Sequence, residues 1–151
     1  MTTQDIYNAL KVTNHLTTAG QPTEAQLRTA AEEGFQAIIN LAMPTSDNAL
    51  KNEGEIVQSL GMTYHSIPVN WENPTESDFT TFDSVMQQLS GQKILLHCAA
   101  NFRATAFYGL YAMKHLGWTA EQADTFRTPI WQDSEYPIWE TFIQGMKNKI
   151  G

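Results

Sequence analysis

The chain has 151 residues, of which 42% are hydrophobic, and its 16 acidic residues outnumber its 9 basic residues for a formal net charge of -7. This length and composition argue against a disordered chain and suit one domain, residues 1–151, with one sizeable core. The acidic balance argues against a broad nucleic-acid or anionic-membrane surface, because both need basic stripes, although a few local donors can still bind an anion.

The single cysteine, Cys98, cannot form an internal disulfide, which fits a reducing compartment. The N-terminus lacks the basic start and apolar core of a signal peptide, so we expect a cytoplasmic protein, unless a leader has been removed. No apolar run approaches the ~20 residues that span a bilayer. The histidines have no metal-ligand spacing, and no Walker loop or dinucleotide fingerprint occurs, so we expect neither metal nor cofactor.

Short apolar runs alternate with segments that show a helical stripe or a capping box. In chain order, the sequence predicts a strand at 15–20, a helix capped by Thr23, a strand at 36–41, a helix ending at Gly61, a strand at 62–69, a helix over 79–89, a strand at 93–97, a helix after Arg103, a helix capped by Thr119 and a last helix after Ser134. This alternation predicts a three-layer α/β fold, with a mostly parallel sheet flanked by helices on both faces.

The segment LLHCAANFRATAF, residues 95–107, is the strongest candidate for chemistry. Cys98 follows a predicted strand, where ligands bind in parallel sheets, and Arg103, with four residues between them, lies in the first turn of a predicted helix. A helix N-terminus and a nearby cation favour a thiolate, loop amides can form an anion nest, and a guanidinium can grip two oxygens. The alternative is that Cys98 is a small buried hydrophobic residue beside an unrelated arginine.

The pair His97-Cys98 and the following Arg103 resemble the signature loop of cysteine-dependent protein tyrosine and dual-specificity phosphatases. A bacterial group of phosphatase-like domains, sometimes fused to metallo-β-lactamase-like hydrolases, is a closer match because it shares the shortened loop. Further similar blocks are AGQPT at 19–23, IINL at 38–41 and IPV at 67–69, the last followed by Pro74 and Thr75. The resemblance covers roughly residues 16–118.

The resemblance implies a protein tyrosine phosphatase-like fold and hydrolysis of phosphate monoesters through a phospho-cysteine. Cys98 would be the nucleophile, and His97 would hold the loop by hydrogen bonds, although it can equally be a satisfied strand-end histidine. The phosphoryl group, or a similar anion such as sulfate, would be bound by Arg103 and by the backbone of Ala99, Ala100, Asn101, Phe102 and Ala104. The expected partner is a small phosphorylated substrate or a phosphoprotein, with no nucleic acid and no membrane.

Three departures from the phosphatase pattern have physical consequences. The loop is one residue shorter than in most of the family. Asn101 stands at a glycine-like position, and asparagine tolerates a left-handed backbone better than most residues. Ala104 lacks the hydroxyl that helps the thiolate to leave in the second step, and Thr105 lies about 100° further round the helix. We therefore expect slow release of phosphate from the cysteine.

The acid that protonates the leaving oxygen is less evident. The family uses an aspartate on a separate loop, but Asn70 stands about where it is expected, and an amide cannot supply a proton. Glu72 is the nearest carboxylic acid; alternatively, it is an exposed loop charge. Asp133 is a second candidate, or else part of a helix lead-in with Ser134 as the N-cap. Asp78 is expected in the first turn of a helix.

Two other functions fit parts of the pattern. Rhodanese-like sulfurtransferases also carry a cysteine after a strand, often with four residues before a basic residue, and a tighter ring suits the persulfide of Cys98. A non-catalytic phosphate-binding module would explain Ala104 and the lack of an obvious acid. The sequence favours a phosphatase over both because of His97 and the flanking blocks.

Overall fold

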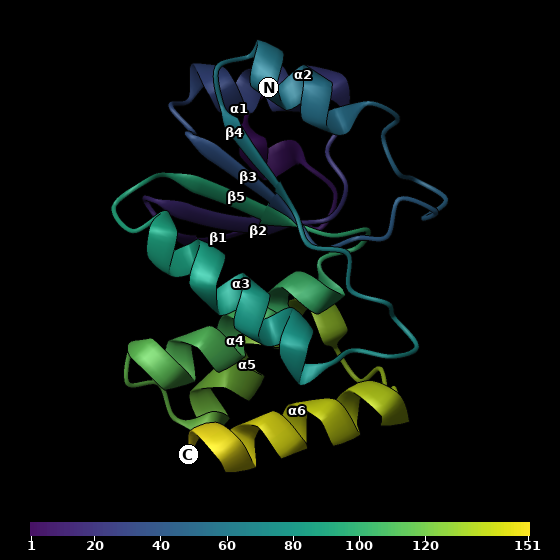
Figure 1. Cartoon of the computed structure of the whole chain (residues 1–151), viewed down its shortest axis with the longest axis vertical. Coiled ribbons are helices and arrows are strands. Elements are labelled where there is room, and N and C mark those ends of the chain that lie inside the picture. Colours follow the sequence, from purple (N-terminus) through teal and green to yellow (C-terminus); the bar gives the residue numbers. More distant parts are fainter.

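The computed structural model describes all 151 residues (Figure 1). The strands are β1 (Leu10–Thr13), β2 (Leu16–Ala19), β3 (Ala37–Asn40), β4 (Thr63–Ser66) and β5 (Ile94–His97). The helices are α1 (Glu24–Glu32), α2 (Glu53–Ser59), α3 (Glu76–Gln88), α4 (Phe102–His115), α5 (Ala120–Trp131) and α6 (Pro137–Ile150), preceded by a short 3-10 helix, Thr3–Asp5. No helix is long and apolar enough to cross a membrane.

The five strands form one sheet in the order β1-β2-β5-β3-β4, in which only β1 runs antiparallel to its neighbour. The register aligns the last residues of the parallel strands: His97 pairs with Ala19 and Asn40, and Asn40 pairs with Ser66. The segments that follow these strands therefore leave the sheet at one edge. Because β5 is central, the segment after His97 is surrounded by the other three.

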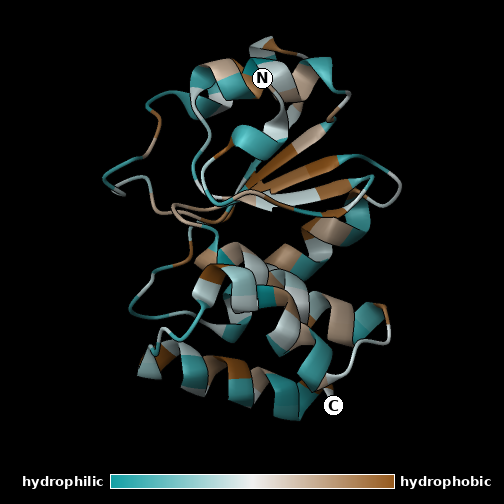
Figure 2. Ribbon diagram, turned by 180° about the vertical axis from the view of Figure 1, so that it is seen from behind, coloured by the Kyte–Doolittle hydropathy of each residue, from teal (hydrophilic) through white to brown (hydrophobic).

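Helices cover both faces of the sheet, as predicted, with α1 and α2 on one face and α3 to α6 on the other (Figure 1). The central strands β3 and β5 are largely hydrophobic, and hydrophilic residues are common on the outward sides of the helices (Figure 2). β5 contributes to both hydrophobic clusters, since Leu95 packs with α1 and α2 while Ile94 and Leu96 pack with the larger cluster. This double burial explains why β5 is a continuous apolar run.

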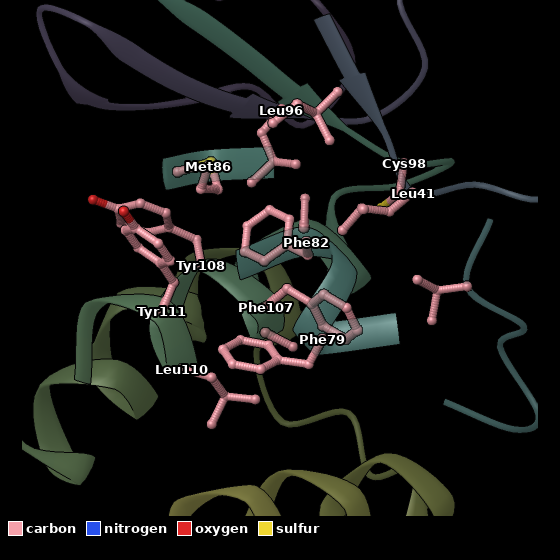
Figure 3. Packing of buried hydrophobic residues seen from close by; sticks show 14 of the residues in the cluster. Leu41, Phe79, Phe82, Met86, Leu96, Cys98, Phe107, Tyr108, Leu110 and Tyr111 are labelled. Atoms are coloured by element: carbon pink, nitrogen blue, oxygen red, sulfur yellow. The ribbon is translucent and has the colours of Figure 1, made fainter. Parts of the chain in front are cut away.

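The larger cluster contains several aromatic side chains and lies between the sheet and α3, α4 and α6 (Figure 3). Phe79 and Phe82 of α3 pack edge-on against Phe107 of α4, with ring centroids 5.7 and 5.6 Å apart. Aromatic pairs of this kind contribute about 0.5–1.5 kcal/mol beyond the area they bury. They fix α4 beneath the sheet, and with it the loop that joins β5 to α4.

Capping boxes set the starts of several helices. The predicted boxes form at α1, between Thr23 and Gln26, and at α5, between Thr119 and Gln122. Asp78 lies in the first turn of α3 as expected, where it completes a third box with Thr75. The prediction that Ser134 caps the last helix is wrong: α6 begins at Pro137, whose fixed φ suits the first position of a helix.

Candidate active site

The residues between β5 and α4 form a compact turn, which we call the anion loop (residues 98–103). Cys98 follows the last residue of β5, its backbone N–H donates to the Ala19 carbonyl at 3.2 Å, and it is 1% exposed. Figure 3 shows its sulfur beside Leu41, at the margin of the larger cluster. Arg103 lies in the first turn of α4. The thiol is thus at the carboxyl edge of the sheet and immediately before a helix N-terminus.

Donors outside the anion loop hold its carbonyl groups. Three consecutive carbonyl oxygens accept such hydrogen bonds: that of Cys98 from His97 Nδ1 (3.1 Å), that of Ala99 from Gln21 N (3.1 Å) and Asn48 Nδ2 (3.0 Å), and that of Ala100 from Asn8 Nδ2 (3.1 Å). With these carbonyls engaged by the surrounding protein, the negative ends of the loop's peptide dipoles are neutralised. The positive ends remain available.

The backbone N–H groups of residues 99, 100 and 102–104 donate to no acceptor within the protein. Those of residues 102–104 belong to the first turn of α4, where N–H groups have no partner within the helix. No side chain caps this end of α4. Successive free amides before and at a helix N-terminus make an anion-binding nest, in which the helix dipole adds to the attraction.

Asn101 gives the loop its turn. Its backbone is left-handed, with φ 70° and ψ 6°, which confirms the expected glycine-like conformation. Its side chain is fully buried and its Nδ2 donates to the Asn8 carbonyl at 2.8 Å and to Thr18 Oγ1 at 3.1 Å. These hydrogen bonds offset the conformational cost of a left-handed asparagine. Glycine would adopt the same backbone without that cost, but it has no side chain to connect the loop to β2.

Arg103 is held with part of its guanidinium unused. The residue is 7% exposed, and its Nη1 donates to the Val69 carbonyl at 2.8 Å. Its Nε is buried without a hydrogen-bond partner. The guanidinium carbon also lies 5.9 Å from the ring centroid of Trp71. A buried charged donor without an acceptor is costly, so its presence beside free amides indicates a place for an anion.

A cavity of about 290 Å³ opens over the anion loop. One cation and three aromatic side chains contribute to its walls, which consist of Trp71, Cys98, Ala99, Ala100, Phe102, Arg103 and Tyr136. The sequence did not single out Trp71 or Tyr136 as site residues, because each comes from a segment distant from the anion loop. Trp71, Phe102 and Tyr136 lie far apart in the sequence, so no motif links them.

The aromatic wall is fixed from behind. Trp71 stacks on Trp139 of α6, with ring centroids 5.2 Å apart and planes at 27°, and Trp139 Nε1 donates to the Trp71 carbonyl at 2.7 Å. Phe102 packs against Trp131 of α5 at 5.0 Å. Tyr136 meets Trp71 edge-on, also at 5.0 Å. The wall therefore belongs to the packed structure of α5 and α6 and is shaped before a substrate arrives.

His97 connects the anion loop to a buried carboxylate. Its ring is fully buried, with Nδ1 3.1 Å from the Cys98 carbonyl oxygen and Nε2 2.7 Å from Glu53 Oε2. Gln21 Nε2 donates to the other oxygen, Oε1, at 2.6 Å. Burial alone would raise the pKa of Glu53, but the hydrogen bond and charge of His97, with further hydrogen bonding from Gln21 and Tyr64, lower it below its ordinary value.

The two predicted acids lie outside the wall of the Cys98 cavity. Glu72 is exposed and lines a neighbouring groove that shares Trp71 and Tyr136 with the cavity. Its backbone N–H donates to Asn70 Oδ1 at 2.9 Å. Asp133 is also exposed, and it lines a third depression at the end of α5. Glu72 is the better placed of the two acids, because its groove shares Trp71 and Tyr136 with the cavity of Cys98.

The residue after Arg103 offers no hydrogen-bonding side chain to the anion loop. Ala104 is fully buried and has no hydroxyl. Thr105, the next residue, donates its hydroxyl to the Asn101 carbonyl at 2.7 Å and accepts from Trp131 Nε1 at 3.1 Å. This hydroxyl is committed to the start of α4. No cluster of three or more His, Cys, Asp or Glu side chains that could hold a metal is present.

Comparisons with known proteins agree with this fold. The family model described as "DSP-PTPase phosphatase fused to NAD+ Kinase" matches residues 2–135. A solved structure titled "Putative phosphatase (DUF442)", from Shewanella putrefaciens CN-32, is 34% identical with a TM-score of 0.91, covering 98% of this chain and 94% of that one. PTPMT1, solved in complex with PI(5)P, is 15% identical with a TM-score of 0.78, covering 95% and 96%, and shares the fold.

A curated relative is much longer than this chain. The beta-lactamase hydrolase-like protein of Agrobacterium fabrum is 32% identical over 106 residues, which are 68% of this chain and 24% of that protein. The chain therefore spans about a quarter of the length of this relative. The fold is that of protein tyrosine phosphatases, as the resemblance of the anion loop implied.

Proposed function

The chain belongs to the family described as DSP-PTPase phosphatase fused to NAD+ kinase, and from this premise we propose that it hydrolyses phosphate monoesters through a phospho-cysteine on Cys98. The observation that carries the proposal is a thiol placed among unused donors. Ala99, Ala100, Phe102 and Arg103, whose N–H groups are free, line the cavity of Cys98, and Arg103 adds an Nε that has no partner. Such donors stabilise the charge that develops on phosphoryl oxygens during transfer.

In the first step, the Cys98 thiolate attacks phosphorus in line, so that a sulfur–phosphorus bond forms as the bond to the leaving oxygen breaks. A carboxylic acid, for which we propose Glu72, gives its proton to that oxygen. In the second step, water attacks phosphorus, its proton passes to the Glu72 carboxylate, and the thiolate leaves. No hydroxyl follows Arg103 to stabilise the departing thiolate, which supports a slow second step.

The cavity walls favour one kind of phosphorylated substrate. PTPMT1 binds a phosphorylated inositol lipid, PI(5)P. Here the cavity of Cys98 has a single cation, Arg103, and aromatic walls from Trp71, Phe102 and Tyr136. One cation and an apolar wall suit a single phosphoryl group on a flat or apolar body, in a small molecule or a phosphoprotein. Several phosphates on one ring would lack further cations in this cavity.

The direct test compares hydrolysis of an aryl phosphate and of a polyphosphorylated inositol by the wild type and by Cys98→Ser. We expect turnover of the aryl phosphate only, and none by the variant. Equal rates in both proteins would remove Cys98 as the nucleophile. Anion binding without turnover in the wild type would instead support a phosphate-binding module.

A sulfurtransferase is the second candidate because the four residues between Cys98 and Arg103 make a smaller ring than most phosphatases have. Sulfur would pass from thiosulfate to Cys98 as a persulfide, with release of sulfite, and then to cyanide as thiocyanate. Measurement of thiocyanate from the same protein preparation separates the two functions. We expect none.

A further inference from the structure

We propose that Glu53 is a positioning residue that acts through His97 to hold the Cys98 thiol in its reactive, ionised form. The inference rests on the proposed function, since it concerns how the nucleophile of that reaction is prepared. Glu53 lies in the first turn of α2, 44 residues before His97 in the sequence. Its side chain is nevertheless 4% exposed, which is unusual for a carboxylate without a role in a buried pair.

Glu53 reaches the anion loop along two paths. Oε2 lies 2.7 Å from His97 Nε2, and the other nitrogen of that ring lies 3.1 Å from the Cys98 carbonyl oxygen. Oε1 accepts from Gln21 Nε2 at 2.6 Å, while the backbone N–H of Gln21 donates to the Ala99 carbonyl at 3.1 Å. One carboxylate therefore supports the two donors that hold the first two carbonyls of the loop.

The geometry also limits where the protons of the pair can lie. Both ring nitrogens of His97 face acceptor oxygens, and a neutral imidazole has only one N–H to donate. Both contacts are satisfied either by an imidazolium beside a Glu53 carboxylate or by a neutral His97 that accepts from a protonated Glu53. The donation from Gln21 Nε2 to Glu53 Oε1 at 2.6 Å favours the carboxylate, so we assign the first arrangement. The lowered pKa of Glu53 agrees with this assignment. The positive member of the pair is adjacent to Cys98 and the negative member lies beyond it, so the pair favours a thiolate.

Other polar groups around the His97–Glu53 pair do not reverse its effect on the Cys98 thiol. On the β4 side, burial first and then the charge of Glu53 raise the pKa of Tyr64 to about 12, so its phenol is neutral near pH 7. Lys51 lines the same polar cavity as Glu53, about 320 Å³ in volume, and is exposed to solvent. On the α4 side, the charged group is Arg103, which itself favours the thiolate. The buried imidazolium depends on Glu53 as its direct counter-ion.

The test is the pH dependence of Cys98 alkylation by iodoacetamide, which does not require phosphatase turnover. Glu53→Gln keeps a hydrogen-bonding side chain of similar size but removes the charge. We expect alkylation about tenfold slower than in the wild type at a pH below the midpoint, with the whole profile moved to higher pH. The aryl phosphate kcat should fall in parallel, with a smaller change in KM.

Asp83→Asn is the matched control. Asp83 Oδ1 lies 2.7 Å from His115 Nε2, the same separation as in the Glu53 pair, but His115 is at the other end of α4, about 20 Å away along the helix. This variant should leave the alkylation profile unchanged. A Glu53→Gln profile that also matches the wild type would overturn the proposal while leaving the phosphatase assignment intact.

A second measurement uses the wild type alone and so does not depend on the folding of Glu53→Gln. Nitrogen-15 NMR of the histidine rings reports how many ring nitrogens carry a proton. We expect both nitrogens of His97 to be protonated at pH 7. A neutral His97 ring at that pH would contradict the proposal whatever the variant does.

Discussion

The two ends of α4 differ in how completely their polar groups are paired. At the C-terminal end, the N–H groups of Leu116 and Trp118 donate to the Ala112 carbonyl at 2.8 and 3.2 Å. Lys114 and His115 there both bond to Asp83 of α3. At the N-terminal end, the amides of residues 102–104 and Arg103 Nε have no acceptor. The polar groups at the C-terminal end are paired within the protein, whereas those at the N-terminal end are available to a ligand.

The difference has a thermodynamic meaning. An unpaired buried donor costs about 1–3 kcal/mol, which folded proteins accept where a ligand will supply the missing acceptor. Cations at a helix C-terminus and anions at its N-terminus both complement the dipole. At the C-terminus of α4 the chain provides the partners itself. At the N-terminus the complementary charges would come from the Cys98 thiolate and from a phosphoryl group.

The largest expected effect comes from removing the nucleophile at the open end. Cys98→Ser should lower kcat for an aryl phosphate by at least about 10³-fold, because serine has no neighbouring base to ionise it. Steady-state rates measure this. The free energy of unfolding should change little, since the substitution is nearly isosteric.

Arg103→Lys should lower kcat/KM by about 10³-fold, because an ammonium cannot keep its bond to the Val69 carbonyl and also offer a fork to two phosphoryl oxygens. The conservative control is Arg28→Lys, whose guanidinium pairs with Glu24 on the exposed face of α1. The control should match the wild type. A similar loss in both variants would mean that the effect is not specific to the open end of α4.

The acid should show itself through the leaving group. Glu72→Gln should lower the rate with phenyl phosphate about 100-fold and the rate with nitrophenyl phosphate much less, since a better leaving group needs less help from a proton. Asp133→Asn serves as the competing variant and should behave as the wild type. The opposite result, with the loss in Asp133→Asn, would transfer the role of the acid to Asp133.

The smallest effect is expected from a substitution of Asp83, which pairs with the C-terminal end of α4. Burial would raise the pKa of Asp83, but the hydrogen bonds and charges of Lys114 and His115 lower it. Its contribution to stability is therefore present above the ordinary aspartate pKa of about 3.9 and is lost as the pH falls below that value. Asp83→Asn should lower the free energy of unfolding by about 1 kcal/mol at pH 7, less at pH 3, without changing kcat. Urea unfolding at the two pH values measures this, and an unchanged stability at pH 7 would show that the pairing is incidental.

The layers of the fold could be predicted because the buried strands are continuous apolar runs. β3 and β5 are largely or fully buried, and they appear in the sequence as short apolar segments. β2 is fully buried too, but two of its four residues are threonines, so its signal is weaker. β1 was missed: it is a short edge strand of alternating partial burial, so its sequence carries little signal. The end of β4 was placed too late, because Ile67 and Val69 are buried beyond the last ladder pair of the strand, while Pro68 between them is exposed.

The anion loop could be predicted because its parts are contiguous in the sequence. Cys98, Asn101 and Arg103 fall within one strand–loop–helix unit, so spacing alone brings them together. Trp71, Tyr136 and Glu53 come from separate segments, and only the packing of α2 and α6 brings them to the loop. Glu53 in particular looks like an ordinary acidic residue in the first turn of a helix. Its burial results from tertiary packing, which the local sequence does not indicate.

The central claim is that Cys98 carries the phosphoryl group during the reaction. The most direct test is rapid mixing of the protein with an aryl phosphate, acid quench, and mass spectrometry of the peptide that contains Cys98. Because Ala104 leaves the second step without a hydroxyl, we expect a phospho-cysteine to accumulate on this peptide and to be absent in Cys98→Ser. Turnover with no phosphorylated peptide, continuing at the same rate in Cys98→Ser, would mean that Cys98 does not carry the phosphoryl group.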